Sequence, residues 1–145
     1  MSSYDPQNIF AKILRGEIPC IKLHEDEHTL AFMDIMPQTE GHALVIPKEP
    51  AVTLFELSDA AAAACMATVR KIGNAQKKGL GADGVVLMQL NGPGAGQTVP
   101  ATDHVASAQG ERERIIAVLA GVELAPLDDA VGQPVIRNIF QTCKI

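Results

Sequence analysis

The spacing of apolar residues along the chain predicts two helices. Residues 8–16 place apolar side chains at positions 9, 10, 13 and 14, with Asn8 suited to cap the start and Gly16 to end the helix. The Ala-rich stretch 59–78 repeats apolar residues along one face and follows Ser58, a favourable N-cap. Its basic residues gather toward the end, where they complement the helix dipole. We therefore predict a short opening helix and one long helix.

Alternating or continuous apolar runs predict the strands. Residues 21–35 form two such runs around an acidic turn, residues 43–46 form a third, and residues 81–91 give a turn and a strand that leads into a Gly-rich loop. Residues 111–124 favour another helix, and the remainder to residue 145 has no clear period. Three strands, a long helix and a strand favour an α+β fold with a mainly antiparallel sheet. With no repeat or linker, we expect one domain over residues 1–145.

Composition and charge narrow the class of partner. The chain has 145 residues, 47% of them hydrophobic, which suffices for a buried core. Its formal net charge of -5 argues against a nucleic-acid partner or an anionic membrane surface. No run approaches the roughly 20 apolar residues of a membrane span, and the first residues lack the features of a signal peptide. We expect a cytoplasmic protein with a small-molecule partner.

Two patterns that suggest metal or disulfide chemistry have simpler interpretations. Residues 24–28, HEDEH, match the H-E-x-x-H zinc pattern, but that pattern needs a helix and here it lies between two predicted strands. We interpret it as a solvated hairpin tip. Cys20, Cys65 and Cys143 are too far apart for a disulfide framework or a zinc ribbon. We therefore expect neither a metal nor a cofactor.

The Gly-rich loop is a candidate phosphate site. Gly92, Gly94 and Gly96 permit positive backbone torsions, so that consecutive N–H groups can converge on an anion. Nearby, Asn91, Gln97 and Thr98 can add side-chain donors. Glycines after a strand also form plain turns, and both interpretations remain open.

Asp34 and His42 lie outside this loop. Asp34 ends an apolar strand just before a proline turn, where a carboxylate can accept from two sugar hydroxyls or can simply form the turn. His42 has no partner close in sequence, and we interpret it as a packing or turn residue.

Four stretches, taken in order, resemble the histidine-triad (HIT) family of nucleotide hydrolases and transferases. They are NIFAKILRGEIPC, LAFMDIMPQTEGHALVIPK, LGADGVVLMQLNG and GPGAGQTV, and the likeness covers about residues 7–100. The resemblance implies a five-stranded antiparallel sheet, a homodimer and a bound purine nucleotide. It assigns the base pocket to Phe32 and Ile35, the ribose hydroxyls to Asp34, and the phosphate to residues of the loop, Asn91, Gly96, Gln97 and Thr98.

The three histidines that name the family are not present in register. Their positions here are Ala101, Asp103 and Val105, while His104 lies one place out of step. Because alternate strand residues face opposite sides, His104 is expected to point away from the nucleotide unless a β-bulge turns it inward. It is nevertheless the one catalytic candidate, with a structural histidine as the alternative.

Two functions therefore remain open. The first is hydrolase or transferase action at the α-phosphate of a purine nucleotide conjugate, and the second is a non-catalytic nucleotide-binding dimer that has lost the triad. Residues 101–145 resemble no part of the family. Two explanations remain open for this difference: natural divergence of the chain, or a change of reading frame.

Overall fold

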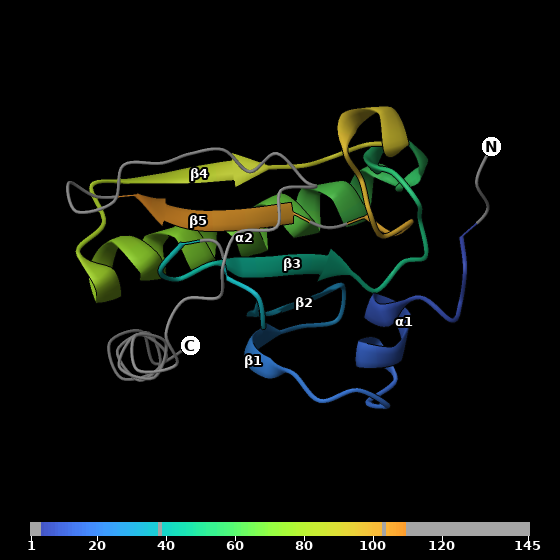
Figure 1. Ribbon diagram of the computed structural model, residues 1–145, viewed down its shortest axis with the longest axis horizontal. Helices are drawn as coiled ribbons and strands as arrows, with labels where there is room; N and C mark the ends of the chain where they lie inside the picture. Colours follow the sequence, from blue (N-terminus) through green and yellow to red (C-terminus); the bar gives the residue numbers. More distant parts are fainter. Residues whose placement is uncertain (1–3, 38, 103, 110–145) are drawn as a thin grey trace.

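A five-stranded antiparallel sheet forms the centre of the protein. The computed structural model describes residues 4–37, 39–102 and 104–109. The sheet has the order β1-β2-β3-β5-β4, so that β5 lies between β3 and β4 (Figure 1). The strands are β1 (Ile21–Glu25), β2 (Thr29–Met33), β3 (Ala43–Pro47), β4 (Gly84–Met88) and β5 (His104–Gln109). Every neighbouring pair is antiparallel, and the predicted α+β class is confirmed.

Both predicted N-caps are confirmed. Helix α1 (Ile9–Leu14) begins after Asn8, whose Oδ1 accepts from the backbone N–H of Ala11 at 2.9 Å. Helix α2 (Asp59–Leu80) begins after Ser58, whose Oγ accepts from the N–H of Ala61 at 3.2 Å. These side chains satisfy N–H groups that have no partner inside the helix. Two short 3-10 turns, η1 (Leu54–Glu56) and η2 (Pro93–Ala95), complete the helical elements of the described residues.

The two faces of the sheet bury different sets of side chains. The face toward α2 holds one cluster: Leu23, Ala31, Met33, Ala43, Val45, Val69, Ile72 and Ala106. The face toward α1 holds Leu30, Phe32, Leu44 and Ile46, packed against Phe10, Ile13, Leu14 and Cys20. Along β2 and β3, odd-numbered residues thus face α2 and even-numbered residues face α1, as strand alternation requires. This alternation assigns each nearby polar residue to a face.

The H-E-x-x-H pattern lies on the hairpin between β1 and β2, as expected. His24 is in β1, and its Nε2 lies 3.3 Å from both Asp26 Oδ2 and Lys71 Nζ. His28 is exposed in the turn before β2. Within the described ranges, no group of three or more His, Cys, Asp or Glu side chains could hold a metal ion.

Two sequence expectations remain: the helix predicted near the end of the chain, and the absence of a membrane-spanning segment. The predicted helix over residues 111–124 and Cys143 lie outside the described residues. In the part of the chain that the structure describes, no helix combines the length and apolar character of a membrane span.

Candidate functional site

Asp34 and His42 form a pair at the loop end of the β2–β3 hairpin. The Asp34 N–H donates to the His42 carbonyl at 3.1 Å, which continues the ladder one step beyond Met33 and Ala43. The side chains meet on the same side, with His42 Nε2 3.3 Å from Asp34 Oδ2. Alternation from Phe32 and Leu44 places this pair on the α1 face. This contact was not predicted from the sequence, although both residues flank strands that a short connection would pair.

The other oxygen of Asp34 is also held. Asp34 Oδ1 accepts from the Met36 N–H at 3.0 Å, as in an Asx turn. The Asp34 side chain keeps 25% of its surface exposed, whereas the His42 side chain keeps 4%. Burial lowers the pKa of His42, against the opposing effect of the Asp34 charge. The carboxylate therefore lies at the surface, in contact with a buried imidazole.

Phe32 and Ile35 occupy very different environments. Phe32 is 4% exposed and packs edge-to-face on Phe10 of α1, with ring centroids 6.2 Å apart. Ile35 is 77% exposed, beside Asp34. Phe32 thus contributes to the packing of α1 on the sheet, while Ile35 offers free apolar surface next to the carboxylate.

The Gly-rich loop is shaped largely by its own hydrogen bonds. Gly92 and Gly96 both have φ near +88°, which suits glycine, and they flank η2. Gln97 Oε1 accepts from the Gly92 N–H at 2.7 Å, while its Nε2 donates to the Val52 carbonyl at 2.6 Å and the Ala101 carbonyl at 3.0 Å. The Gln97 amide therefore holds the loop closed and attaches it to the segment before η1.

Asn91 also attaches the loop to another segment, whereas Thr98 lies at the surface. Asn91 Oδ1 accepts from the Leu54 N–H at 2.8 Å, which joins the loop to η1. Thr98 is exposed. No Lys or Arg occurs in the sequence between residues 79 and 111, so the loop itself offers an anion only backbone and side-chain dipoles. Of the predicted phosphate donors, Thr98 is the exposed one, and Gln97 and Asn91 are engaged within the fold.

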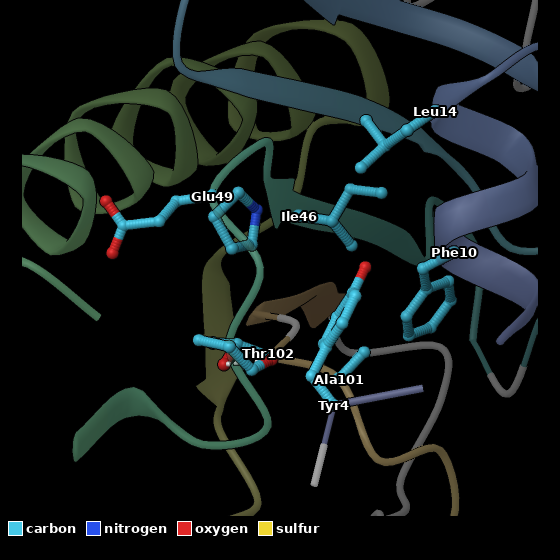
Figure 2. Close-up of a pocket in the computed structure, with 9 residues that line it drawn as sticks. Tyr4, Phe10, Leu14, Ile46, Glu49, Ala101 and Thr102 are labelled. Carbon is cyan, nitrogen blue, oxygen red and sulfur yellow. Dashed lines mark hydrogen bonds between the residues drawn. The ribbon is translucent and has the colours of Figure 1, made fainter. Parts of the chain in front are cut away.

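Ala101, the first of the three triad positions, lies beside the N-terminal segment. It is 4% exposed and lines a small pocket with Tyr4, Phe10 and Ile46 (Figure 2). The next residue, Thr102, donates through its N–H to the Ala51 carbonyl at 3.0 Å. The second position, Asp103, and the side chain at the third, Val105, lie outside the described residues.

His104 lies on the other face of the sheet. Its register partner is Val45 in the core cluster beneath α2, and paired residues of antiparallel strands point to the same side. It is 5% exposed and lines a cavity of about 210 Å³ together with Met66 and Val69 of α2. Its Nε2 has no hydrogen-bond partner among the described residues, and burial lowers its pKa. The register between β3 and β5 is regular from His104 to Ala106, so the described ladder contains no bulge that would turn the ring.

A family model and the most similar relatives place the chain in the same protein family. The HIT domain model matches residues 15–105. Adenosine 5'-monophosphoramidase hnt1 of Schizosaccharomyces pombe is 46% identical over 97 residues, 67% of this chain and 68% of the relative. Adenylylsulfatase HINT3 of Arabidopsis thaliana is 43% identical over 91 residues, 63% of this chain and 46% of the relative.

A solved structure gives the same result for the fold. The crystal structure of a Hit-like protein from Bartonella henselae, described as involved in cell-cycle regulation, superposes with a TM-score of 0.81 at 35% identity. The match covers 97% of this chain and 99% of that one. The HIT-like fold is thereby confirmed, and the chain belongs to the HIT family.

Proposed function

We propose that this protein binds a purine nucleotide conjugate on the α1 face of the sheet. The observation that carries the proposal is the partly exposed Asp34 carboxylate beside the exposed Ile35. Its Oδ1 accepts from the Met36 N–H, and its Oδ2 lies 3.3 Å from His42 Nε2. A carboxylate in this position accepts two ribose hydroxyls, and Ile35 supplies apolar contact for a base next to it. The positive-φ turns of Gly92 and Gly96 and the exposed Thr98 would then approach the phosphate.

The reaction proposed for this site is hydrolysis or transfer at the α-phosphate. It is supported by family membership and by relatives named as an adenosine 5'-monophosphoramidase and an adenylylsulfatase. In such a reaction an imidazole nitrogen attacks the α-phosphorus and displaces the leaving group of the conjugate, which departs with a proton. Water then breaks the phosphorus–nitrogen bond of the nucleotidyl-enzyme, releasing the nucleotide and the free imidazole. His104 is the candidate for that step in this chain, and it would have to move out from beneath α2 to act.

A second candidate function is nucleotide binding without turnover. It is favoured by the register of β5, which pairs His104 with Val45 on the face opposite Asp34. It is favoured also by the small apolar side chain of Ala101 at the first triad position. Under this alternative the pocket keeps its ligand and has lost its nucleophile.

A homodimer is the proposed assembly, with β4 at its centre. In the described sheet β4 is an edge strand paired only with β5, and an edge strand exposes backbone groups that a second copy can pair. Apolar side chains are exposed beside this edge: Met66 at 52%, Val86 at 44% and Leu87 at 50%. Leu87→Asp should shift the protein to a monomer in size-exclusion chromatography with light scattering. Phe55→Asp, at a residue 83% exposed on η1, is the matched control and should leave the mass unchanged.

A cytoplasmic location is part of the proposal and rests on the composition of the chain.

Binding and turnover are tested separately. Calorimetry with AMP should give micromolar binding, and Asp34→Ala should weaken it by about 1 to 3 kcal/mol. Asp83→Ala removes an exposed carboxylate before β4 and should leave binding unchanged. Release of AMP from an adenosine phosphoramidate, compared between wild type and His104→Ala, then separates the two functions. Equal background rates in both proteins would support binding without turnover, and absence of AMP binding would overturn both.

A further inference from the structure

The cavity beneath α2 lies on the face of the sheet opposite Asp34, and nucleotide binding does not use it. It has a volume of about 210 Å³ and is lined by Met66, Val69, Leu87, Met88, Gln89 and His104. Met66 and Leu87 are 52% and 50% exposed, whereas Val69 and His104 are 2% and 5% exposed. The cavity therefore extends from the surface of the protein to side chains buried between α2 and the sheet.

Two polar side chains of this cavity, His104 and Gln89, lie next to each other. The β4–β5 ladder pairs Met88 with Val105, so one further step sets Gln89 opposite His104 on the same side of the sheet. His104 Nε2 and Gln89 Oε1 are both buried, and neither has a hydrogen-bond partner among the described residues. Because Gln89 Nε2 donates to Asn91 Oδ1 at 3.2 Å, the amide oxygen is the group left to accept.

The lining favours a neutral ligand. None of the described residues that line the cavity is Asp, Glu, Lys or Arg, so a charged ligand would leave water without meeting an opposite charge. Burial lowers the pKa of His104, and its ring is therefore neutral at pH 7. In the tautomer that carries its proton on Nε2, the ring donates toward the cavity while Gln89 Oε1 accepts.

The volume fits one or two fused rings. An apolar cavity of about 150 Å³ holds benzene, and this cavity is somewhat larger. Val69 and Leu87 supply apolar walls for ring carbons. A donor and an acceptor on adjacent residues require a ligand with an acceptor and a donor on adjacent atoms.

We propose that this cavity binds a neutral aromatic heterocycle whose edge carries an N–H beside an acceptor nitrogen, as in pyrazole-type azoles such as indazole. The N–H donates to Gln89 Oε1, and the neighbouring ring nitrogen accepts from His104 Nε2. Such a ligand supplies partners for two buried polar atoms, which otherwise cost the fold free energy. The inference does not depend on nucleotide binding at Asp34, because the two sites lie on opposite faces of the sheet.

The test is calorimetric binding of indazole and of indene, a hydrocarbon of the same shape, to the full-length protein. Indazole should bind saturably at one site per chain, with an affinity at least about tenfold higher than that of indene. Gln89→Met removes the acceptor, and His104→Leu removes the donor and keeps an apolar side chain. Each should lower the indazole affinity about tenfold and leave the indene affinity unchanged. His28→Ala, at the exposed hairpin tip, is the matched histidine control and should change neither affinity.

Further measurements separate this cavity from the nucleotide site and from a dimer contact. Saturating AMP should leave the indazole affinity unchanged, and displacement of indazole by AMP would overturn the inference. Equal affinities for indazole and indene, or no saturable binding of indazole, would overturn it as well. Binding that appears only after dilution to a monomer would mean that a second copy covers the cavity, which also overturns it. If His104→Leu does not fold, Gln89→Met and the comparison with indene decide. Absence of AMP binding refutes the proposed function and leaves this inference intact.

Discussion

Replacement of Gln97 tests whether the Gly-rich loop is held by its own side chains. Gln97→Ala removes three hydrogen bonds, from the Gly92 N–H and to the carbonyls of Val52 and Ala101. Val52 and Ala101 are 5% and 4% exposed, so water replaces these partners poorly. At about 1 kcal/mol net for each bond, the free energy of unfolding should fall by about 2 to 3 kcal/mol.

The assay is equilibrium urea denaturation followed by circular dichroism. With a slope of about 2 kcal/mol per molar urea, the loss corresponds to a midpoint lower by about 1 to 1.5 M. Thr98→Ala is the matched control, because Thr98 is the neighbouring polar residue and is exposed, and it should change the free energy of unfolding by less than about 0.5 kcal/mol. Gln97→Glu keeps an acceptor for Gly92 but turns a carboxylate toward two carbonyls, so it should be no more stable than the alanine variant.

The unfolding midpoint and the AMP affinity of Gln97→Ala, measured together, distinguish a structural role of the amide from a direct contact with the ligand. If Gln97→Ala unfolds at the wild-type midpoint but binds AMP more weakly, the amide is not needed to hold the loop and acts on the ligand directly. If both stability and binding fall, the loss of affinity follows from the loss of loop geometry. Thr98→Ala removes a side-chain donor without unfolding the loop, so its AMP affinity would then show what a direct contact of this loop with the ligand contributes.

Three further predictions concern the helix, the core and the buried histidine. Ser58→Ala removes the α2 cap and should cost about 1 kcal/mol in urea denaturation, against no measurable loss for Asp83→Ala. Ile72→Ala, at a residue 2% exposed under the sheet, should cost about 2 to 5 kcal/mol, and a cost no larger than that of Met66→Ala would contradict the assigned core. Because burial lowers the pKa of His104 below that of the unfolded chain, the unfolded state binds more protons, and stability should fall as the pH drops below about 6.5. His104→Leu should lose part of that dependence in urea denaturation at pH 5 and pH 7, and an identical dependence in both proteins would contradict the buried neutral ring.

The elements that depend on local sequence could be predicted. Asn8 and Ser58 cap helices because their side chains reach N–H groups three residues ahead, and such contacts can be inferred from a short window. The hairpin at residues 24–28 follows in the same way from apolar runs on both sides of an acidic turn. Each of these features is decided by neighbours in the chain.

The functional details that escaped prediction depend on partners far along the chain. Gln97 contacts Val52 across 45 residues, and Asn91 contacts Leu54 across 37. The sequence predicts both amides as phosphate donors, and that role stays a prediction; what the sequence did not indicate is their hydrogen bonds within the fold. His42 and Asp34 are only eight residues apart, but their contact depends on the exact pairing of β2 with β3. Amide and imidazole groups satisfy distant backbone as readily as ligands, and only the fold determines which they do.

The position of His104 follows from more than strand alternation, because α2 fixes the register of β5. Gln76 of α2 is fully buried and donates from Nε2 to the carbonyls of Gly41 and Ala106, at 2.6 and 2.9 Å. Ala43 and Ala106 are paired and both 0% exposed, and their small side chains fit beneath the helix. A slip of one residue would turn the Ala106 carbonyl away from Gln76 and bring a larger side chain under α2. Turning His104 toward Asp34 by such a slip would therefore break the hydrogen bond from Gln76 to the Ala106 carbonyl and disturb the packing of Ala106 beneath α2, a barrier that any catalytic role for this imidazole must overcome.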